Sequence, residues 1–279
     1  MLRNFRLGLC QFAAGADKPA NLQLAQQMIE EAVAKGAQVV MLPECFNSPY
    51  HTKHFPNYAE EIPGNSQSSP TVSFLQNMAR THKIYLIGGS IPEIDSQKYY
   101  NTCICLNPDG EIQTKHRKVH LFDINVPGKI TFYESEILSP GSQATIFSTE
   151  FCKIGVGICY DLRMPEYAYT LGKSEEVGLL AYPGNFNVVT GEKHWEVLLR
   201  ARAVDNQIFV AACSQARDPE GEYLSWGHSM LVNPWGQVLN STTHLPQVVI
   251  QDVDFAVLQE NRTSLMNRQH KKWSVYDMS

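Results

Sequence analysis

The spacing of hydrophobic positions in the first part of the chain alternates between strand and helix periods. Residues 7–12 and 37–42 are apolar runs of strand length, and between them apolar residues recur at helical spacing. Gly36 suits the C-terminal cap of that helix. Pro70 marks the first turn of a second helix, and a strand at 84–91 follows it. Strands and helices that alternate across short connections predict an α/β fold.

The rest of the chain continues the pattern and adds two hairpins. Asn107–Gly110 and Asn233–Gly236 each combine Pro and Gly between apolar runs, which is typical of a hairpin turn. Residues 47–68 and 123–143 show no regular period, so we expect long loops there, the first at the mouth of a site. Further strands are expected at 99–106, 111–115, 154–158, 177–182, 207–214, 226–233, 237–240 and 248–253, and further helices from Pro165, over 192–204 and after Asp254.

Composition and charge narrow the class of protein. Of 279 residues, 43% are hydrophobic and 18% are charged, which favours a large core over a disordered chain. No linker, low-complexity segment or tandem repeat interrupts residues 1–279, so one domain is expected, with 263–279 as a polar tail. The net charge of −5 without a basic block argues against nucleic acid or an anionic membrane as a partner. No apolar run reaches the roughly 18 residues that a membrane span requires.

The number of cysteines and the first residues of the chain predict where in the cell the protein is located. Seven cysteines is an odd number, and several lie inside apolar runs, so free thiols in a reducing compartment are expected rather than disulfides. The chain enters an apparent strand a few residues after Met1, without an apolar signal core. We therefore expect a cytoplasmic protein, with a mitochondrial pool as the open alternative.

Cys159 is the residue on which the candidate chemistry depends. It ends the alternating strand 154–158, and Pro165 then favours the start of a helix. A thiol between a core strand and a helix start is well placed for a nucleophile. The alternative is a small buried core residue, since free cysteines are usually buried. Gly155 and Gly157 favour the nucleophile, because they clear space beside the sulfur for backbone or ligand.

Two more reactive side chains lie at the C-terminal end of an apolar strand or just past one. Glu44 follows the strand 37–42, and Lys118 follows the hairpin strand 111–115. Because the C-terminal strand ends of α/β sheets form the site, Glu44, Lys118 and Cys159 are candidates for one common site. Taken singly, Glu44 could be a helix-start carboxylate and Lys118 a solvated charge.

In this order the three residues resemble the Glu-Lys-Cys triad of the nitrilase, or carbon–nitrogen hydrolase, superfamily. The likeness runs almost from end to end and includes the blocks Leu7–Phe12, Lys118–Phe132 and Arg202–Gln207. These blocks look most like the omega-amidase branch, whose members hydrolyse the terminal amide of 2-oxo acids. The resemblance implies a four-layer αββα sandwich, with two sheets flanked by helices, that pairs into a homodimer or higher homo-oligomer. It also implies a small-molecule amide as substrate, and no cofactor or metal.

Splitting an amide requires a nucleophile, a proton shuttle and a positive group for the oxyanion. Our hypothesis is that Cys159 forms a thioester with release of ammonia, while Glu44 takes the thiol proton, protonates the leaving amine and activates water. Lys118 would stabilise the oxyanion, with the backbone N–H of Tyr160 as second donor. By the resemblance, Glu134 in Ile-Thr-Phe-x-Glu neighbours the lysine and the bound amide; the alternative is a surface loop carboxylate.

Three residues are candidates for choosing the substrate. Arg163 could form a bidentate hydrogen bond with a carboxylate. The resemblance implies that Arg163 lies near the oxo-acid end of the substrate. The alternative is an ion pair with Asp161 or Glu166. Phe186 matches an aromatic residue that lines the family's pocket, and Tyr50 is a further candidate; for both, plain packing is the alternative.

The chain departs from the omega-amidase pattern at several positions. His51 stands where Gly is expected, Asn185 stands where Ala is usual, and residues 172–176 carry a small insertion. The segment after Arg262 also diverges. We expect these positions near the site mouth or a subunit surface, so they leave substrate preference and assembly open.

Other interpretations of the cysteines and of the function remain. Cys103 and Cys105 would point to one face of a strand, and core packing is favoured over a zinc site because two further ligands at suitable spacing are lacking. Cys45 is expected to point away from Glu44, and no papain-like signature surrounds any cysteine.

The expected substrates are 2-oxoglutaramate and 2-oxosuccinamate. An N-carbamoyl-amine hydrolase, a nitrilase and a non-catalytic binder are the alternatives, and the intact triad argues against the last.

Overall fold

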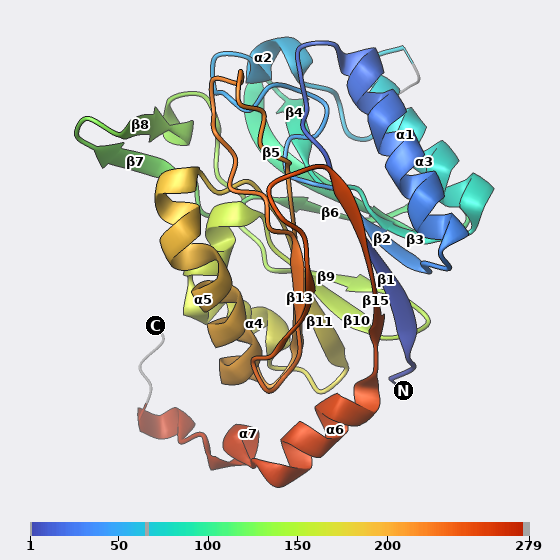
Figure 1. The fold of residues 1–279 in the computed structure, drawn as a ribbon, viewed down its shortest axis with the longest axis vertical. Coiled ribbons are helices and arrows are strands. Elements are labelled where there is room, and N and C mark those ends of the chain that lie inside the picture. The colour runs from blue at the N-terminus through green and yellow to red at the C-terminus, as the bar shows by residue number, and fades with distance from the viewer. Residues whose placement is uncertain (1, 65–66, 276–279) are drawn as a thin grey trace.

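The computed structural model describes residues 2–64 and 67–275, and most of its strands form two large sheets (Figure 1). These strands are β1 (Phe5–Gln11), β2 (Val39–Met41), β3 (Tyr85–Ile87), β4 (Ile91–Asp95), β5 (Lys98–Leu106), β6 (Ile112–Arg117), β9 (Thr145–Ser148), β10 (Lys153–Val156), β11 (Val177–Gly184), β12 (Phe209–Ser214), β13 (Met230–Val232), β14 (Val238–Ser241) and β15 (Gln247–Val253). Among the described residues, the first sheet runs β15-β1-β2-β3-β5-β4 with β6 beside β5, and the second runs β14-β13-β12-β11-β10-β9.

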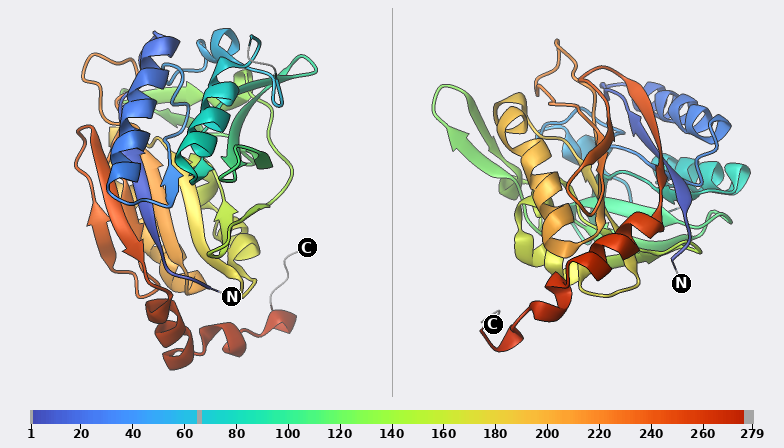
Figure 2. Two further views of the ribbon diagram at one scale, coloured as in Figure 1. Left: turned by 90° about the vertical axis from the view of Figure 1, so that its right-hand side faces the viewer. Right: turned by 60° about the horizontal axis from the view of Figure 1, so that its bottom comes forward.

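Helices cover the outer face of each sheet. The helices are α1 (Lys18–Ala34), α2 (Phe55–Tyr58), α3 (Pro70–His82), α4 (Pro165–Gly172), α5 (Val188–Asn206), α6 (Phe255–Ser264) and α7 (Asn267–His270), with 3₁₀ turns η1 (Glu134–Glu136), η2 (Cys159–Arg163) and η3 (Trp273–Val275). α1 and α3 pack on the first sheet, and α4 and α5 on the second (Figures 1 and 2). The predicted four-layer αββα sandwich is therefore confirmed.

The strand β2 explains why its sequence is apolar at every position. Val39 and Met41 point into the core between the two sheets, whereas Val40 and Leu42 point into the core beneath α1 and α3. Successive side chains of a strand alternate between its faces, so a strand that is covered on both sides has no polar side. This burial places the C-terminal end of β2, and Glu44 just beyond it, deep inside the molecule.

Parallel neighbours bring the candidate site residues to related strand ends. β1, β2 and β3 are parallel to one another, and so are β10, β11 and β12. Glu44 follows β2, and Cys159 follows β10, so both lie past the C-terminal end of a parallel strand. This arrangement is the one in which α/β sheets form their sites.

The prediction of a loop over residues 123–143 is wrong. The segment forms a hairpin of β7 (Asp123–Val126) and β8 (Ile130–Tyr133), followed by η1, and the hairpin extends away from the body of the molecule (Figure 1). Gly128, with a φ of 72°, provides the turn. The strands are only four residues long and mostly exposed or half-buried, so no clear apolar period marks them.

Smaller differences concern where elements begin and end. The expected strand 84–91 breaks after β3, because Gly89 turns the chain with a φ of 62° before β4 begins. α2 interrupts the expected loop 47–68, and α5 starts four residues earlier than predicted because Asn187 caps it through the N–H of Val189.

The C-terminal region after α6 continues as α7 and η3 across one end of the molecule (Figure 2). Arg268 of α7 binds this region to the ends of α4 and α5, because its guanidinium donates hydrogen bonds to the carbonyl oxygens of Gly172 and Asn206. Residues 276–279 of the expected tail lie outside the described residues. Within the described part of the chain, no helix is long and apolar enough to cross a membrane.

Candidate active site

Cys159 begins η2 at a sharp turn that follows β10. Its φ of 46° lies in the left-handed region, which is uncommon for a residue with a side chain and is often found at functional sites. The residue is 3% exposed, and its Sγ accepts a hydrogen bond from the backbone N–H of Asn185 at 3.5 Å. The turn therefore holds the sulfur where β10 and β11 both end.

The two glycines before Cys159 make room for core side chains, whereas we expected them to clear space beside the sulfur for backbone or a ligand. A Cβ at Gly155 would lie 2.7 Å from Cδ2 of Leu180, and a Cβ at Gly157 would lie 2.6 Å from Cε1 of Tyr182. Core side chains already fill the space beside both glycines. Their role is to let neighbouring side chains approach the backbone of the strand that leads to Cys159.

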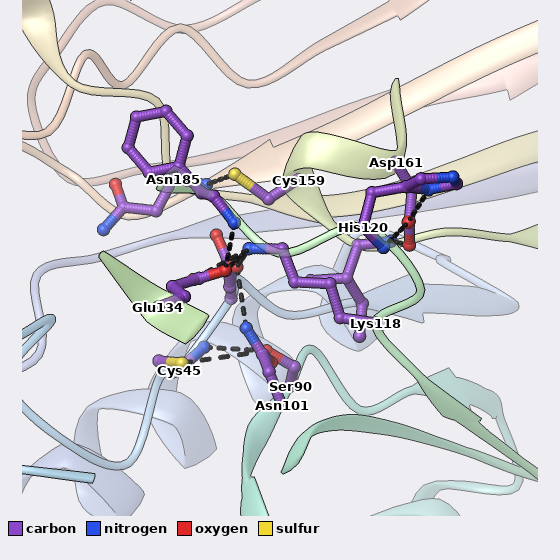
Figure 3. A network of polar contacts seen from close by, with 12 residues as sticks. Cys45, Ser90, Asn101, Lys118, His120, Glu134, Cys159, Asp161 and Asn185 are labelled. Carbon is purple, nitrogen blue, oxygen red and sulfur yellow. Dashed lines mark hydrogen bonds and ion pairs between the residues drawn. The ribbon is translucent and has the colours of Figure 1, made fainter. Parts of the chain in front are cut away.

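Lys118 is completely buried and lies between two carboxylates. Its Nζ is 2.9 Å from an oxygen of Glu44 and 2.9 Å from an oxygen of Glu134, and its backbone N–H donates to the carbonyl oxygen of Asn101 (Figure 3). Burial alone would lower the pKa of the Lys118 ammonium, but the charges of Glu134 and Glu44 outweigh it and raise that pKa well above its usual value. The structure thus places an ammonium, whose charged form the two carboxylates favour, in the interior and not on the surface.

Glu44 offers one engaged and one unengaged oxygen. Oε1 accepts hydrogen bonds from Lys118 Nζ at 2.9 Å and Asn101 Nδ2 at 2.8 Å. Oε2 is buried and has no partner among the described residues. Burial raises the pKa of Glu44 despite the opposing effect of Lys118. A buried carboxylate with a raised pKa and an open acceptor atom is suited to take up and return a proton.

Burial also raises the pKa of the Cys159 thiol well above its usual value, and the nearby Glu44 carboxylate raises it further. The thiol is therefore neutral at pH 7. An attack by the sulfur would require a base that removes its proton, and the Glu44 carboxylate lies near enough to affect the pKa of the thiol.

Glu134 begins η1 directly after the hairpin and is completely buried rather than on a surface loop. Besides Lys118, its carboxylate accepts the backbone N–H of Phe122 at 2.7 Å and the hydroxyl of Tyr50 at 3.1 Å. The Tyr50 ring in turn stacks on Phe132 of β8 at a centroid distance of 5.8 Å. The hairpin and the 47–54 segment thus fix the second carboxylate against the lysine.

Arg163 does not form the ion pair that we considered as its alternative role. Its Nη1 lies 3.1 Å from Nδ1 of His194, and its Cζ lies over the Phe186 ring at 4.6 Å and over the Tyr160 ring at 5.6 Å. Within the described part of the chain it contacts no carboxylate, and burial lowers its pKa. A half-buried guanidinium near Cys159 is left available for an anionic group.

Aromatic residues enclose this region. Phe186 is buried against Trp195 at a centroid distance of 5.0 Å, and Tyr160 packs 5.4 Å from Phe122. A cavity of about 300 Å³ opens between the 14–16, 49–54 and 215–225 segments, and Tyr50 and Tyr223 are among its lining residues. The cavity therefore reaches the two tyrosines that contact Glu134 and Asn185.

The departures from the omega-amidase pattern lie in different places. Asn185 is completely buried beside Cys159, and neither atom of its side-chain amide has a partner among the described residues (Figure 3). His51 lines the cavity. Residues 172–176 lie away from the site, where Glu175 pairs with Arg262 and Arg268.

Reasoning from the sequence missed two groups of polar residues in this site. Asn101 on β5 donates to Glu44, and Asp161 accepts hydrogen bonds from His116 and His120, the residues two positions on either side of Lys118. His116 and His120 each lie two residues from Lys118, and Asp161 lies two residues after Cys159. This proximity in the sequence could have marked them as site residues. Nothing in the sequence near Glu44 indicated Asn101, because it comes from a distant strand.

The other cysteines are core residues. Cys45 has a φ of 50° and turns its Sγ toward Ser90 Oγ, 4.0 Å away, as expected for a residue that points away from Glu44. Cys103 and Cys105 both lie in the core between the sheets, as predicted. Among the described residues, no group of His, Cys, Asp or Glu is arranged to hold a metal ion.

A thiol beside a carboxylate and a buried ammonium provides a nucleophile, a proton acceptor and a positive charge. Enzymes that cleave carbon–nitrogen bonds through a covalent intermediate need these three groups. The sequence profile of the carbon-nitrogen hydrolase family matches residues 6–263. The chain belongs to this family. It is 51% identical to "Omega-amidase NIT2" of Xenopus tropicalis, with 99% of this chain and 98% of that protein covered.

Two further comparisons agree with this assignment. The chain is 49% identical to "Omega-amidase, chloroplastic" of Arabidopsis thaliana, with 99% of this chain and 75% of that protein covered. The crystal structure of Saccharomyces cerevisiae Nit3, described as a member of branch 10 of the nitrilase superfamily, superposes with a TM-score of 0.89 at 40% identity, with 98% of this chain and 97% of that chain covered. The resemblance to the nitrilase superfamily is therefore confirmed.

Proposed function

We propose that this chain is an omega-amidase that hydrolyses the terminal amide of 2-oxo dicarboxylate monoamides, such as 2-oxoglutaramate and 2-oxosuccinamate. The observation that carries the proposal is the buried Lys118 ammonium, shared by Glu44 and Glu134 next to the Cys159 thiol. Identity of about half to omega-amidases over nearly the whole chain supports the choice of substrate class.

The first half of the reaction forms a thioester. Cys159 Sγ attacks the amide carbonyl carbon while Glu44 Oε2 takes the thiol proton. The carbonyl oxygen becomes an oxyanion, which Lys118 and the backbone N–H of Tyr160 stabilise. Glu44 returns the proton to the amide nitrogen, the carbon–nitrogen bond breaks, and ammonia leaves.

The second half restores the enzyme. Glu44 takes a proton from water as the hydroxide attacks the thioester carbon, and the same cation stabilises the second oxyanion. The carbon–sulfur bond breaks, the sulfur recovers the proton, and the 2-oxo acid leaves. All groups in both halves belong to the chain, so the proposal includes no cofactor. Glu134 holds Lys118 in place and faces the bound amide.

Selection of the substrate rests on Arg163 and three aromatic residues. In our proposal the Arg163 guanidinium pairs with the carboxylate at the oxo-acid end, because it contacts no carboxylate of its own within the described chain. Phe186, Tyr160 and Tyr50 line the apolar walls around the carbon chain of the substrate. We further propose a homodimer or higher homo-oligomer and a cytoplasmic location, with a mitochondrial pool as the alternative.

An ammonia-release assay tests the function directly. Purified protein is given 2-oxoglutaramate, 2-oxosuccinamate, an N-carbamoyl amine and an aliphatic nitrile, with Cys159→Ala as the control. We expect turnover of the two oxo-amides, loss of all turnover in the control, and an acyl adduct on Cys159 by mass spectrometry after brief exposure. Turnover of the nitrile or the carbamoyl compound without the oxo-amides would overturn the proposal, as would an active Cys159→Ala variant.

A further inference from the structure

Asp161 is a completely buried carboxylate whose two oxygens accept four hydrogen bonds. Oδ1 accepts the backbone N–H of His120 at 2.9 Å and lies 2.7 Å from Nδ1 of the same residue. Oδ2 accepts the backbone N–H of Ile158 at 2.9 Å and lies 3.1 Å from Nε2 of His116. These donors hold the pKa of Asp161 well below its usual value against the opposing effect of burial, so the group stays ionised.

The four donors come from two segments that are far apart in the sequence. Ile158 directly precedes Cys159, and His116 and His120 flank Lys118. One carboxylate therefore joins the turn of the nucleophile to the segment of the cation (Figure 3). His116 continues the connection, since its Nδ1 lies 3.0 Å from the hydroxyl of Thr145 on β9.

The strained backbone at Cys159 makes such a connection useful. A residue with a φ of 46° keeps this conformation only when its surroundings hold it there. The N–H of Ile158 is the last backbone donor before that residue, and Asp161 captures it across the turn. Without the carboxylate, the turn and the lysine segment would lose the group that fixes one relative to the other.

We infer that Asp161 is a positioning residue, which sets the distance between the Cys159 sulfur and the Lys118 ammonium by binding both backbone segments. It does not touch the substrate; it acts through Cys159 and Lys118. The inference rests on the proposed function, because it takes these two residues as nucleophile and oxyanion cation.

The test is Asp161→Asn, which keeps the size of the side chain but leaves one acceptor oxygen in place of two. We expect kcat on 2-oxoglutaramate to fall about 10²-fold, the scale of a misplacement of about 1 Å, while KM changes little because Arg163 is untouched. The rate of alkylation of Cys159 by iodoacetamide is expected to fall at least about tenfold, since the sulfur shifts relative to Lys118 and to the Glu44 carboxylate that Lys118 binds.

A matched control is Glu60→Gln. Glu60 is also a buried carboxylate that accepts backbone N–H groups, those of Thr71 and Val72, and it pairs with Lys18 away from the sulfur. We expect this variant to lower the melting temperature while kcat and alkylation stay at wild-type values. His120→Gln, which alters a partly exposed donor, serves if Asp161→Asn does not fold; it is expected to lower kcat about three- to tenfold at unchanged KM.

The outcomes separate this inference from the proposed function. The inference is overturned if Asp161→Asn folds and keeps the wild-type kcat. If Asp161→Asn does not fold, it is overturned by a wild-type kcat in His120→Gln. Equal losses of activity in Glu60→Gln would also overturn it, because the effect would then follow stability alone. If the wild type hydrolyses no oxo-amide, the proposed function fails. The alkylation rate of Cys159 then decides on the positioning role by itself. An unchanged rate in Asp161→Asn rejects that role, and a loss in Asp161→Asn but not in Glu60→Gln supports it.

Discussion

At the scale of single residues, the site depends on how a few buried groups are protonated. The Cys159 thiol and the Glu44 carboxyl both have raised pKa values, chiefly because of burial, whereas the pKa of Lys118 is raised by its two glutamates. These shifts favour a neutral thiol beside a charged ammonium, and they favour proton uptake by Glu44 at a higher pH than for an ordinary glutamate. In the proposed mechanism, the unengaged oxygen of Glu44 is the acceptor for the thiol proton.

A prediction about pH follows from the raised pKa of Glu44. The carboxylate base appears only above that pKa, so kcat/KM is expected to fall as pH drops, at a pH higher than an ordinary glutamate would give. No loss from Lys118 is expected on the alkaline side below about pH 9, because its pKa is raised. Glu44→Gln should lower kcat by about 10²–10⁴ and remove the acidic limb. An unchanged acidic limb in the variant, measured by ammonia release from pH 5 to 9, would assign it to another group.

At the scale of elements, close packing on β11 joins the second sheet to the C-terminal helix. A Cβ at Gly178 would lie 2.4 Å from Cε1 of Phe255, the first residue of α6, which is itself buried. The approach is too close for any side chain, so a larger residue must displace the ring. α6 therefore depends on this glycine for its position against the sheet.

Gly178→Ala is expected to lower the free energy of unfolding by about 1–3 kcal/mol through overpacking, with little change in KM. Urea unfolding monitored by circular dichroism measures the effect. The control is Gly172→Ala at the end of α4, where the nearest neighbouring atom would be an ordinary 3.4 Å away. That change should be neutral or stabilise the helix by up to about 1 kcal/mol. Comparable destabilisation by both would mean that space at Gly178 is not the cause.

At the scale of the whole molecule, two exposed apolar residues lie on the outer helix α5. Val197 and Val204 of α5 are 57% and 45% exposed and, seven residues apart, lie on the same face. The turn at Gly236 packs against Val204, and neighbouring Trp235 is 42% exposed. The proposed homo-oligomer would cover this face, since an outer helix layer with exposed apolar residues is suited to association.

Light scattering after size exclusion is expected to give a mass of at least twice the 31.4 kDa of the chain. Charges introduced by the double substitution Val197→Glu and Val204→Glu should shift the protein toward the monomer, because buried unpaired carboxylates oppose association. A matched change on the exposed side of α1, Leu24→Glu, should leave the mass unchanged. A monomeric wild type, or a double variant of unaltered mass, would exclude this surface as the interface.

The sequence by itself determined most of the order of strands and helices, the α/β class and the candidate triad. Periodicity is a local property, so the apolar run that ends at Leu42 and the alternating run before Cys159 were visible without coordinates. Strand ends are where α/β folds form sites, which made Glu44, Lys118 and Cys159 candidates. The weakly patterned hairpin that carries Phe132 was missed, because half-exposed short strands leave little periodic signal.

Only the tertiary structure decided which of these side chains meet. Lys118 is joined to Glu44 across 74 positions of the chain, Glu44 to Asn101 across 57, and Asp161 to His120 across 41. The same packing left Arg163 without the ion pair that its sequence neighbours suggested. The reason is physical: a local pattern records which face of an element is buried, whereas the partners of a buried charge depend on how distant elements pack against one another.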